Sequence, residues 1–520
     1  MQKFFQMFVN TNGLLLAIVC TSFPSAATAQ LSAPVEYSIG TSPDPYIPNA
    51  APASEIVHDF DGDAKLDLLV THRTDESLYL LKGNGDGTFK PAVRIRVGAP
   101  IQGNIYSGDF NGDTKLDVFL PGAKGHAIIL PGNGDGTFGS PIVSSSFNHD
   151  GYYPRGWAVG KFTSSGKLDV AFTLPTNSGK AARYGILLGN GDGTFKDALL
   201  SPGELVYSRW IASGDFNRDD RLDLAVADGH GTSSDPGTAR MVVLLGNGDG
   251  TFKMGSHYSS PQFPSGDGWQ DVNAVGHPEN LVVADLTGRG ILDVVVSDYS
   301  STINIFMGNG DGTFQNAVSY NTGNYPRNVI PIDMNHDRKI DLVVTNVGIG
   351  IGGAIFQKVG AHAGSICVLT GNGDGTFQQP ITYNSSAFPG YTVAADFNGD
   401  GLPDLATTQV FDGHSVHVML NDPKNKNLPP VFVNPPSASL TGTTAQLSVL
   451  GDDDGGESEI IYAWSTVGPA PASVTYSANY SHDAQNAKAT FAKSGTYVLQ
   501  CKQTDKLGLS VTKLVVVKVP

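Results

Sequence analysis

Short apolar runs separated by polar, glycine-rich segments recur along most of the chain. The first set comprises residues 54–58, 66–70, 78–81 and 89–95, and each run has the length of a β-strand. The run at 66–70 is almost continuously apolar, which is typical of a strand buried on both faces. Asn-Gly and Asp-Gly pairs before the last run favour a tight hairpin. The pattern therefore predicts a unit of four antiparallel strands.

Two short motifs alternate through this pattern. The heptapeptide Gly-Asn-Gly-Asp-Gly-Thr-Phe occurs six times without change, and an acidic nonapeptide with Asp or Asn at alternate positions and Asp at its end alternates with it. Self-similarity with a period of 20–50 residues or slightly more is the signature of solenoids and propellers. The heptapeptides begin at Gly83, Gly132, Gly189, Gly246, Gly308 and Gly371, the intact nonapeptides at Asp59, Asp109, Asp215, Asp333 and Asp396, and two degenerate nonapeptides at Lys161 and Asp285.

Seven units of this kind predict an all-β fold, a seven-bladed β-propeller over residues 30–424. An open solenoid is the competing arrangement. The last unit lacks a fourth strand after 416–420, whereas residues 35–39 resemble a fourth strand without the preceding three. The N-terminal segment can therefore complete the last blade and close the ring without a free edge.

The pattern changes after the last unit. Four prolines mark a linker at 425–436, and residues 437–520 contain shorter alternating runs that predict a small β-sandwich. The predicted strands are 445–449, 460–464, 489–491, 497–503 and 510–519.

The first 29 residues have the features of an export signal. Lys3 precedes a short apolar stretch at 13–23, and Ala27-Thr28-Ala29 is a small-x-small cleavage site before Gln30. The stretch is too short for a membrane span, which needs about 20 residues, and no later stretch qualifies. A lipoprotein site at Cys20 is disfavoured by the bulky residue before it. We expect a protein that is secreted, periplasmic or at the cell surface after cleavage near Ala29.

Composition narrows the function classes. The chain has 49 acidic and 33 basic residues, a net charge of -16 and no basic cluster, so nucleic-acid binding is not expected. Glycine accounts for 63 of 520 residues, which favours turns and short strands over long helices. Cys367 and Cys501 remain after removal of the signal and allow one disulfide at most. An exported chain of this size therefore needs another source of stability.

The acidic nonapeptides carry the candidate chemistry. Oxygen-bearing side chains at positions 1, 3, 5 and 9, with the carbonyl of position 7, can surround one hard cation, and calcium takes six to eight oxygen ligands. Magnesium fits less well because it prefers a smaller octahedral shell. The motif is no EF-hand, since position 12 lies inside an apolar strand. The alternative is that the Asp residues merely cap turns, as Asp and Asn often do.

Motif and blade rhythm together resemble the FG-GAP/VCBS repeat family, which includes the propeller of integrin α-subunits; the resemblance covers roughly residues 35–420. It implies calcium bound between the first two strands of a blade, in about five structural sites. Lys161 and Arg289 stand at positions 1 and 5 of units three and five, where we expect a built-in cation to replace the metal. The implied ligands are Asp59, Asp61, Asp63 and Asp67; Asp109, Asn111, Asp113 and Asp117; Asp215, Asn217, Asp219 and Asp223; Asp333, Asn335, Asp337 and Asp341; and Asp396, Asn398, Asp400 and Asp404.

Two other features depart from or extend this resemblance. Arg218 and His336 occupy position 4 of units four and six, where the family commonly has Gly. The C-terminal segment is similar to polycystic-kidney-disease and immunoglobulin-like modules, with Trp464 followed by Tyr497 and Cys501 but without the first Cys. The heptapeptide is most simply a hairpin with glycines at positive φ and a Phe that packs between blades.

Strand parity places the acidic loops and the heptapeptide turns on one face of the ring, and the long irregular insertions on the other. Variable loops on one face are common sites of function. Aromatic residues beside Arg in this second region could hold a sugar or an anionic glycan, or could simply pack and hydrogen-bond at the blade entrances. These candidate ligand residues are Tyr153, Arg155, Trp157, Tyr207, Arg209, Tyr325 and Arg327.

No catalytic motif of the Gly-x-Ser-x-Gly, His-Glu-x-x-His or phosphate-loop type occurs, so no enzyme is expected. The resemblance implies a monomeric extracellular recognition or cell-adhesion module that binds a protein or a glycan. The alternative is a secreted polysaccharide-active enzyme, a lyase or glycosidase, that uses the loop face of the propeller.

Overall fold

The computed structural model describes most of the chain. Segment 1–28, residue Tyr207 and residues 425–429 of the predicted linker lie outside the described residues. The described residues are 29–39, 52–72, 76–144, 147, 153–175, 182–203, 205, 208–228, 240–259, 278–298, 301–348, 364–385, 389–409, 415–422, 430–453, 460–468, 470–505 and 509–520.

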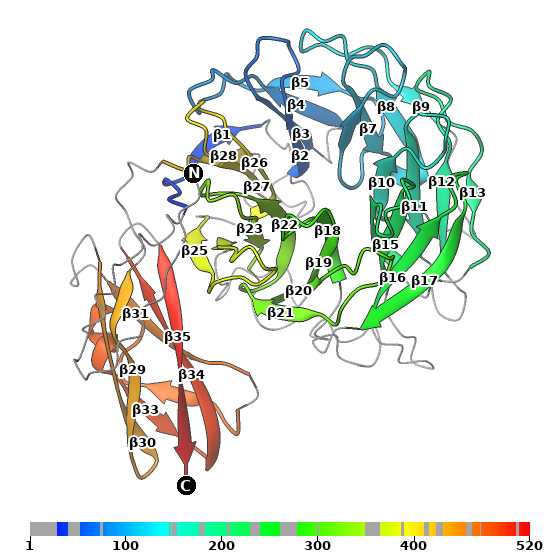
Figure 1. The fold of residues 1–520 in the computed structure, drawn as a ribbon. Helices are drawn as coiled ribbons and strands as arrows, with labels where there is room; N and C mark the ends of the chain where they lie inside the picture. Colours follow the sequence, from blue (N-terminus) through cyan, green and yellow to red (C-terminus); the bar gives the residue numbers. More distant parts are fainter. Residues whose placement is uncertain are drawn as a thin grey trace, which may run out of the picture.

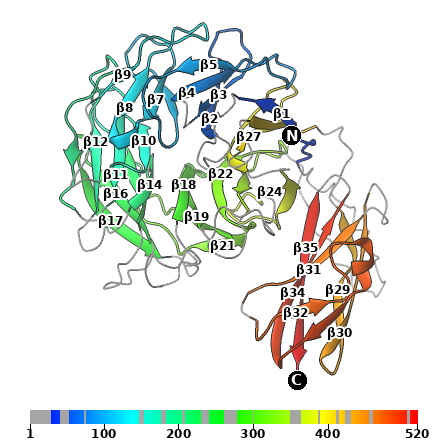
Figure 2. The same ribbon diagram turned by 180° about the vertical axis from the view of Figure 1, so that it is seen from behind.

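Four-stranded antiparallel sheets follow one another around a ring (Figures 1 and 2), and the described strands make seven of them. The innermost strands are β2 (Pro52–His58), β6 (Tyr106–Gly108), β10 (Trp157–Gly160), β14 (Ser208–Gly214), β18 (Pro278–Ala284), β22 (Pro326–Ile332) and β26 (Pro389–Ala395). The second strands are β3 (Asp67–His72), β7 (Asp117–Pro121), β11 (Asp169–Leu174), β15 (Asp223–Asp228), β19 (Asp293–Asp298), β23 (Asp341–Asn346) and β27 (Asp404–Gln409).

The outer half of each sheet has two further strands, and a short 3-10 turn, η1 (Ala123–Gly125), lies in the second blade. The third strands are β4 (Ser77–Leu81), β8 (Ala127–Leu130), β12 (Arg183–Leu187), β16 (Arg240–Gly246), β20 (Thr302–Phe306), β24 (Ser365–Leu369) and β28 (Ser415–Met419). The fourth strands are β5 (Val93–Arg96), β9 (Ile142–Val143), β13 (Leu199–Leu200), β17 (Phe252–Ser259), β21 (Val318–Asn321) and β25 (Ile381–Asn384).

The apolar runs of the second strands explain the stability of the ring. Every residue of β3, β7, β11, β15, β19, β23 and β27 is buried. Such strands contribute side chains to the cores on both faces of their sheet: Leu69 packs toward the second blade and Leu68 toward the last one. The buried clusters therefore lie between neighbouring blades. The prediction of an all-β propeller is confirmed.

The N-terminal segment closes the ring, as predicted. Strand β1 (Val35–Ser38) pairs antiparallel with β28, with Val35 opposite Val418, and completes the sheet β1-β28-β27-β26. The next residue, Ile39, is fully buried between this sheet and the first blade. Because the outer edge of the last blade is paired by a segment from the other end of the chain, the first and last blades are held together.

A second unit follows the ring. Its two sheets enclose one core around Tyr462, Trp464 and Tyr497, and the 3-10 turn η3 (His482–Asn486) accepts the Trp464 indole N–H at 2.8 Å through Ala484. One sheet contains β29 (Val431–Thr441), β30 (Thr444–Asp452), β33 (Lys488–Phe491) and β32 (Val474–Tyr476), and the other β31 (Ile461–Thr466), β34 (Gly495–Thr504) and β35 (Ser510–Val519).

Five of these strands match the predicted ones, but β29 corrects the predicted linker. The strand begins at Val431, inside the range 425–436, and continues through Pro435 and Pro436 with a shift in register. Proline is tolerated there because β29 is an edge strand, so its missing N–H breaks no ladder. Cys367 and Cys501 are both buried and free.

The second unit lies beside the blade that contains β25 in both ribbon views (Figures 1 and 2). Ser510 of β35 pairs with Thr382 of β25, which joins the two units in one continuous sheet. Leu509 is 4% exposed and packs into the propeller core beside Tyr383. Within the described ranges, the structure contains no helix with the length and apolarity that a membrane crossing requires.

Candidate metal centres

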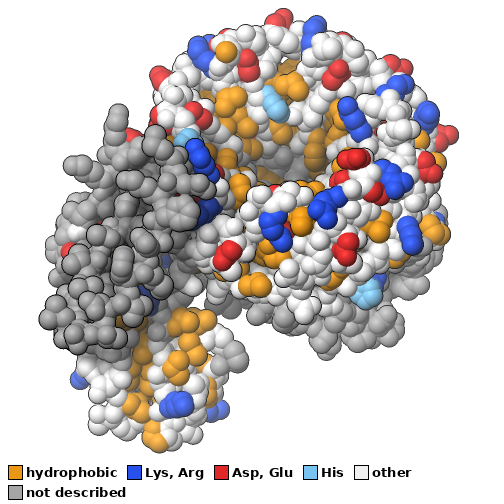
Figure 3. Space-filling view, viewed as in Figure 1, with side chains coloured by type: hydrophobic (Ala, Val, Ile, Leu, Met, Phe, Trp, Pro, Cys, Tyr) orange, Lys and Arg blue, Asp and Glu red, His pale blue; other side chains and the backbone are white. Residues whose placement is uncertain are grey.

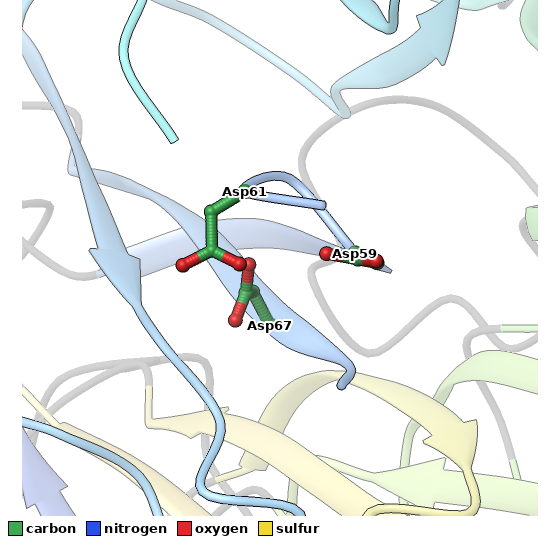
Figure 4. Close-up of side chains that lie close together, drawn as sticks. All are labelled: Asp59, Asp61 and Asp67. Atoms are coloured by element: carbon green, nitrogen blue, oxygen red, sulfur yellow. The ribbon is translucent and has the colours of Figure 1, made fainter. Parts of the chain in front are cut away.

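The first acidic loop, between β2 and β3, brings three of its four predicted ligands together. One oxygen each from Asp59, Asp61 and Asp67 lie within 4.8 Å of one another, and the carboxylates of Asp61 and Asp67 face each other (Figure 4). Two oxygens on opposite sides of a calcium ion bound at about 2.4 Å are about 4.8 Å apart. The donor set is all oxygen, so both spacing and chemistry fit this ion.

Position 5 of several loops has a second partner that the sequence analysis did not anticipate. In loop one Asp63 lies outside the three-carboxylate group, and Lys65 Nζ lies 3.4 Å from its Oδ2. The same pairing of positions 7 and 5 joins Arg221 to Asp219 at 2.7 Å, where the hydrogen bond from Arg221 lowers the Asp219 pKa. These position-5 carboxylates are therefore partly neutralised by a neighbouring cation.

Position 1 organises the loop backbone. Asp59 Oδ1 accepts the N–H groups of Gly62 at 2.7 Å and Asp63 at 3.1 Å, and Oδ2 accepts that of Ala64 at 2.8 Å. The other intact loops repeat the bond from position 5 to this carboxylate. The turn-capping role of these Asp residues is thus present in each intact loop. A carboxylate offers about four lone-pair sites, so capping leaves capacity for a cation.

Position 9 joins each loop to the turn between the third and fourth strands. Asp67 Oδ2 accepts the Phe60 N–H at 3.0 Å and Oδ1 accepts the Gly83 N–H at 2.9 Å. Burial raises the pKa of Asp67, and raises those of Asp341 and Asp404 to about 6. A bound cation would favour the ionised form. The equivalent pair of bonds is made by all seven position-9 residues: Asp67, Asp117, Asp169, Asp223, Asp293, Asp341 and Asp404.

The sixth loop contains an orphaned buried oxygen. Asp337 Oδ1 accepts the Lys339 N–H, but Oδ2 is buried without a hydrogen bond to any described residue, and the Lys339 ammonium lies 3.8 Å away. A buried carboxylate oxygen without a donor is unfavourable unless a cation is close. In loops two, four, six and seven, position 3 is Asn, and its Oδ1 accepts the position-5 N–H.

The two non-Gly residues at position 4 adopt the conformation that Gly has elsewhere. Arg218 and His336 have φ of 59° and 58°, compared with 76° at Gly62. This left-handed region is costly for residues with a Cβ. Arg218 gains a contact in return, because its Nε donates to the Gly310 carbonyl of the next blade at 3.1 Å.

The degenerate loops differ from each other. In unit five, the Arg289 guanidinium donates to Asp293 Oδ1 at 3.2 Å and to Thr287 Oγ1 at 2.5 Å, so a built-in cation lies among the loop oxygens as expected. In unit three, Lys161 is exposed and has no described contact with Asp169. The Thr163 hydroxyl donates to Asp169 Oδ2 at 3.2 Å instead.

Lys82, which directly precedes the first heptapeptide turn, contacts loop one and is not among the predicted site residues. Its ammonium lies 2.9 Å from Asp61 Oδ2 and 3.5 Å from the carbonyl oxygen of Asp135 in the next blade's turn. The hydrogen bond with Asp61 raises the Lys82 pKa. In the other units the residue before the turn is uncharged, so the motif comparison alone gave no signal.

The heptapeptide turns dock on the acidic loops of the preceding blade, which confirms that both lie on one face. The Gly that follows Asp in the turn is the donor: Gly136 N–H reaches the Phe60 carbonyl at 2.8 Å, and Gly312 N–H reaches that of Phe216 at 2.9 Å. The turn Phe packs on the same loop residue, with Phe314 and Phe216 ring centroids 5.3 Å apart. The predicted Phe anchor between blades is therefore present.

The candidate glycan-binding residues differ in how far their side chains are exposed to solvent. Trp157 is 4% exposed and packs between Phe119 and Phe172, so packing in the core accounts for a Trp at this position. Arg327 lies over the Tyr391 ring at 5.1 Å. Tyr153 and Arg155 are exposed, Tyr325 is half-buried, and Arg209 lies on β14. On the ring face seen in Figure 3, hydrophobic side chains line a central hollow and charges of both signs are spread over the rim.

The fold defines a class, a β-propeller, and part of the chain is similar to FG-GAP-like repeats. The FG-GAP-like repeat model matches residues 59–120, 285–344 and 358–407. Over 207 residues the chain is 25% identical to human cartilage acidic protein 1, a match that spans 39% of this chain and 29% of that protein.

Solved structures are also similar. Two structures of BBS1N in complex with ARL6DN, soaked with mercury and with lead, align with TM-scores of 0.47 at 12% identity. They cover 76% and 74% of this chain and 99% and 98% of theirs. FG-GAP repeats are typical of non-enzymatic modules, and these matches indicate no enzyme family.

Proposed function

We propose that the five intact acidic loops bind calcium and that the ions stabilise the propeller. The observation that carries the proposal is the clustering of three carboxylate oxygens in loop one within the span of one calcium ion. The ligands we assign are the residues at positions 1, 3, 5 and 9, of which position 5 would exchange its Lys or Arg partner for the ion in loops one, four and six. The ion would neutralise carboxylates that otherwise repel one another.

The expected stabilisation is large for a chain whose two described cysteines are free. An extracellular-type site with a Kd of about 0.1 mM, in about 1 mM calcium, stabilises by about 1.4 kcal/mol. Five such sites contribute about 7 kcal/mol, which is comparable with the whole stability of many domains.

Two measurements test the calcium proposal. Calorimetry should show a lower melting temperature in chelator than in calcium, and an unchanged value would contradict a structural role. Native mass spectrometry should count five ions, and Asp59→Asn should remove one. Asp86→Asn is the matched control because Asp86 lies in an exposed heptapeptide turn and bonds Thr88 instead. Equal loss in both variants would exclude the loop as the site.

Position 9 is a poor place for this test. Asp67 holds the loop to the turn through two backbone N–H groups, so its replacement would destabilise the blade with or without metal. Asp59 bonds backbone groups within its own loop, and Asn at that position can still accept one of them.

We propose further that the protein is exported and acts as an extracellular recognition or adhesion module for a protein or glycan. FG-GAP-like repeats and the partial match to cartilage acidic protein 1 support this class. The exposed pair Tyr153 and Arg155, with Arg209 and Arg327 at equivalent positions of other blades, is the candidate contact region.

A glycan and extracellular-protein array tests the contact region. The variant Arg155→Gln/Arg209→Gln/Arg327→Gln should lose the wild-type binding signal at an unchanged melting temperature. A charge-matched control, Lys90→Gln/Arg96→Gln/Lys196→Gln, changes exposed residues near the outer strands and should retain it. Equal binding by all three proteins would refute the site.

A further inference from the structure

The turn that should follow β28 in the last blade is divided between the two ends of the chain. In the other blades, the heptapeptide connects the third and fourth strands. After β28 the chain provides Asn421 and Asp422, and the next described strand is β29 of the second unit. The missing half of the turn is supplied by residues 29–32.

Four contacts establish this equivalence. Leu31 bridges Asn421 as Phe89 bridges Gly83. Ser32 N–H donates to the Leu420 carbonyl at 2.7 Å as Lys90 N–H donates to that of Lys82 at 2.8 Å. Asp422 N–H donates to the Gln30 carbonyl at 3.0 Å, as Asn84 N–H donates to the Thr88 carbonyl at 2.9 Å in the first blade. Asn421 N–H donates to Oδ1 of Asp404, the position-9 residue, at 2.7 Å, as Gly83 N–H donates to Oδ1 of Asp67 at 2.9 Å.

The side chain of Asn421 joins the two halves. Its Oδ1 accepts the Gln30 N–H at 2.9 Å, and its Nδ2 donates to the Met334 carbonyl of the preceding blade at 2.7 Å. The second bond replaces the one that a turn glycine makes in other blades. Leu31 packs in the cluster that contains Met334, where other turns place Phe. The divided turn therefore docks on the sixth acidic loop.

Ala29 belongs to this assembly. It is 3% exposed, it packs with Leu31, Met334 and Leu509, and its carbonyl accepts the hydroxyl of the buried Tyr383. Removal of Ala29 would leave that hydroxyl without its partner and would place a charged amino group on Gln30 beside Asn421. A buried polar group without a partner is costly, and a buried charge more so.

We infer that processing of the exported chain leaves Ala29 in place, and that the cut follows Ala27. This inference rests on the proposed export. Ser25-Ala26-Ala27 is a small-x-small sequence two residues before Ala27-Thr28-Ala29, so signal-peptidase chemistry accommodates it. Hydrolysis of the Ala27–Thr28 peptide bond by water releases the segment 1–27 and a chain that begins at Thr28. The retained residues then complete the ring and meet the second unit at Leu509.

Intact-mass measurement and N-terminal sequencing of the exported full-length protein test the cut. A chain that begins at Thr28 is expected. A chain that begins at Gln30, or at the pyroglutamate formed from it, would overturn the inference and leave the export proposal intact. A chain that begins at Met1 in the exported fraction would instead contradict the signal-peptide proposal.

A second measurement tests the structural role without relying on export. Chains that begin at Thr28, Gln30 and Ala33 are released from a cleavable tag and melted in chelator. The first should melt highest, the second a few degrees lower and the third lowest. When Tyr383→Phe is introduced into both the Thr28 chain and the Gln30 chain, most of the difference between their melting temperatures should disappear, because neither chain then has a hydroxyl that needs the Ala29 carbonyl. Equal melting of all chains would overturn the divided turn.

Discussion

Glu55 is the least expected residue of the ring, and replacing it should stabilise the protein. It lies on β2, faces the last blade and is 4% exposed. Both carboxyl oxygens are buried without a hydrogen bond of ordinary geometry within the described chain. Four residues before position 1, the other six blades have Ile105, Trp157, Ile211, Leu281, Val329 and Thr392.

Burial raises the Glu55 pKa well above its ordinary value, and the nearby N–H of Thr408 offsets the effect in part. The folded protein therefore holds a proton on Glu55 at pH values where the unfolded chain has lost it. The contribution of Glu55 to the free energy of unfolding is therefore highest below the pKa of the unfolded chain, about 4.3, and it is lost as pH rises through the pKa of the folded protein. For one group the slope is at most about 1.4 kcal/mol per pH unit.

The variant Glu55→Leu, which imitates Leu281 in the fifth blade, should gain about 1–3 kcal/mol at pH 7, the usual cost of an unpartnered buried polar group. Urea unfolding at several pH values between 4.5 and 8, in chelator, measures the difference. The gain should grow with pH. Glu55→Gln retains the polar group but cannot ionise, so its pH profile should run parallel to that of Glu55→Leu.

Two outcomes would refute this reasoning. Parallel pH profiles for the wild type and Glu55→Gln would mean that Glu55 does not titrate differently in the folded protein. A loss of stability in Glu55→Leu at pH 7 would mean that the carboxyl has a stabilising partner at the closure of the ring.

Three further changes test the loops and the closure. Lys82→Met should raise the calcium affinity of loop one by up to about fivefold in isothermal titration, because removal of the half-buried Lys82–Asp61 pair is worth about 1 kcal/mol. Asn421→Ala should lower the free energy of unfolding by about 2–4 kcal/mol in urea, since the buried Met334 carbonyl and the part-buried Gln30 N–H lose their partner. Thr287→Asn with Arg289→Asp restores the intact motif in unit five and should add one calcium ion in native mass spectrometry.

Each change has a matched control. Lys90→Met removes an exposed cation from the same blade, and an equal rise in affinity would exclude a specific role for Lys82. Asn372→Ala removes an exposed bond to Thr376 and should cost well under the loss at Asn421. Thr287→Asn alone leaves Arg289 in the loop, so a gain of an ion in that variant would contradict replacement of the metal by the guanidinium.

The repeated features of the fold were predictable because the same motifs recur at the same offsets in each unit, so every unit supports the same prediction. The four strands, the common face of loops and turns, and the closing strand at 35–39 follow from motif offsets and strand parity. The second unit was predicted less completely. The residues of β29 include Pro435 and Pro436, and a proline pair gives the same local signal in a linker and in an edge strand.

Features that occur once could not be predicted from the repeats. Lys82 replaces an uncharged residue in one blade only, and its partners lie on two different loops. Asn421 stands where the sequence pattern ends, and its role depends on Gln30, 391 positions away. Glu55 lies between the first and last blades, at a position that is apolar in five of the other blades. The roles of all three residues depend on contacts with parts of the chain that lie outside their own repeat motif.

The seven loops differ at the positions that could bind an ion but share the residue that holds the blade together. Position 9 is Asp in every unit, including units three and five, and each of these residues bonds the loop and the turn. Positions 1, 3 and 5 vary, and both degenerate loops keep the same strands. In unit three the Phe162 carbonyl accepts the Gly250 N–H from the turn of the next blade, and in unit five Leu286 packs with Phe377 from the turn of the next blade. The position-9 carboxylate is therefore the structural requirement of a blade, while the remaining oxygens set its capacity for a cation. On this argument an ion can be lost from one blade without loss of the ring, as long as a side chain such as Arg289 or Thr163 meets the buried carboxylate.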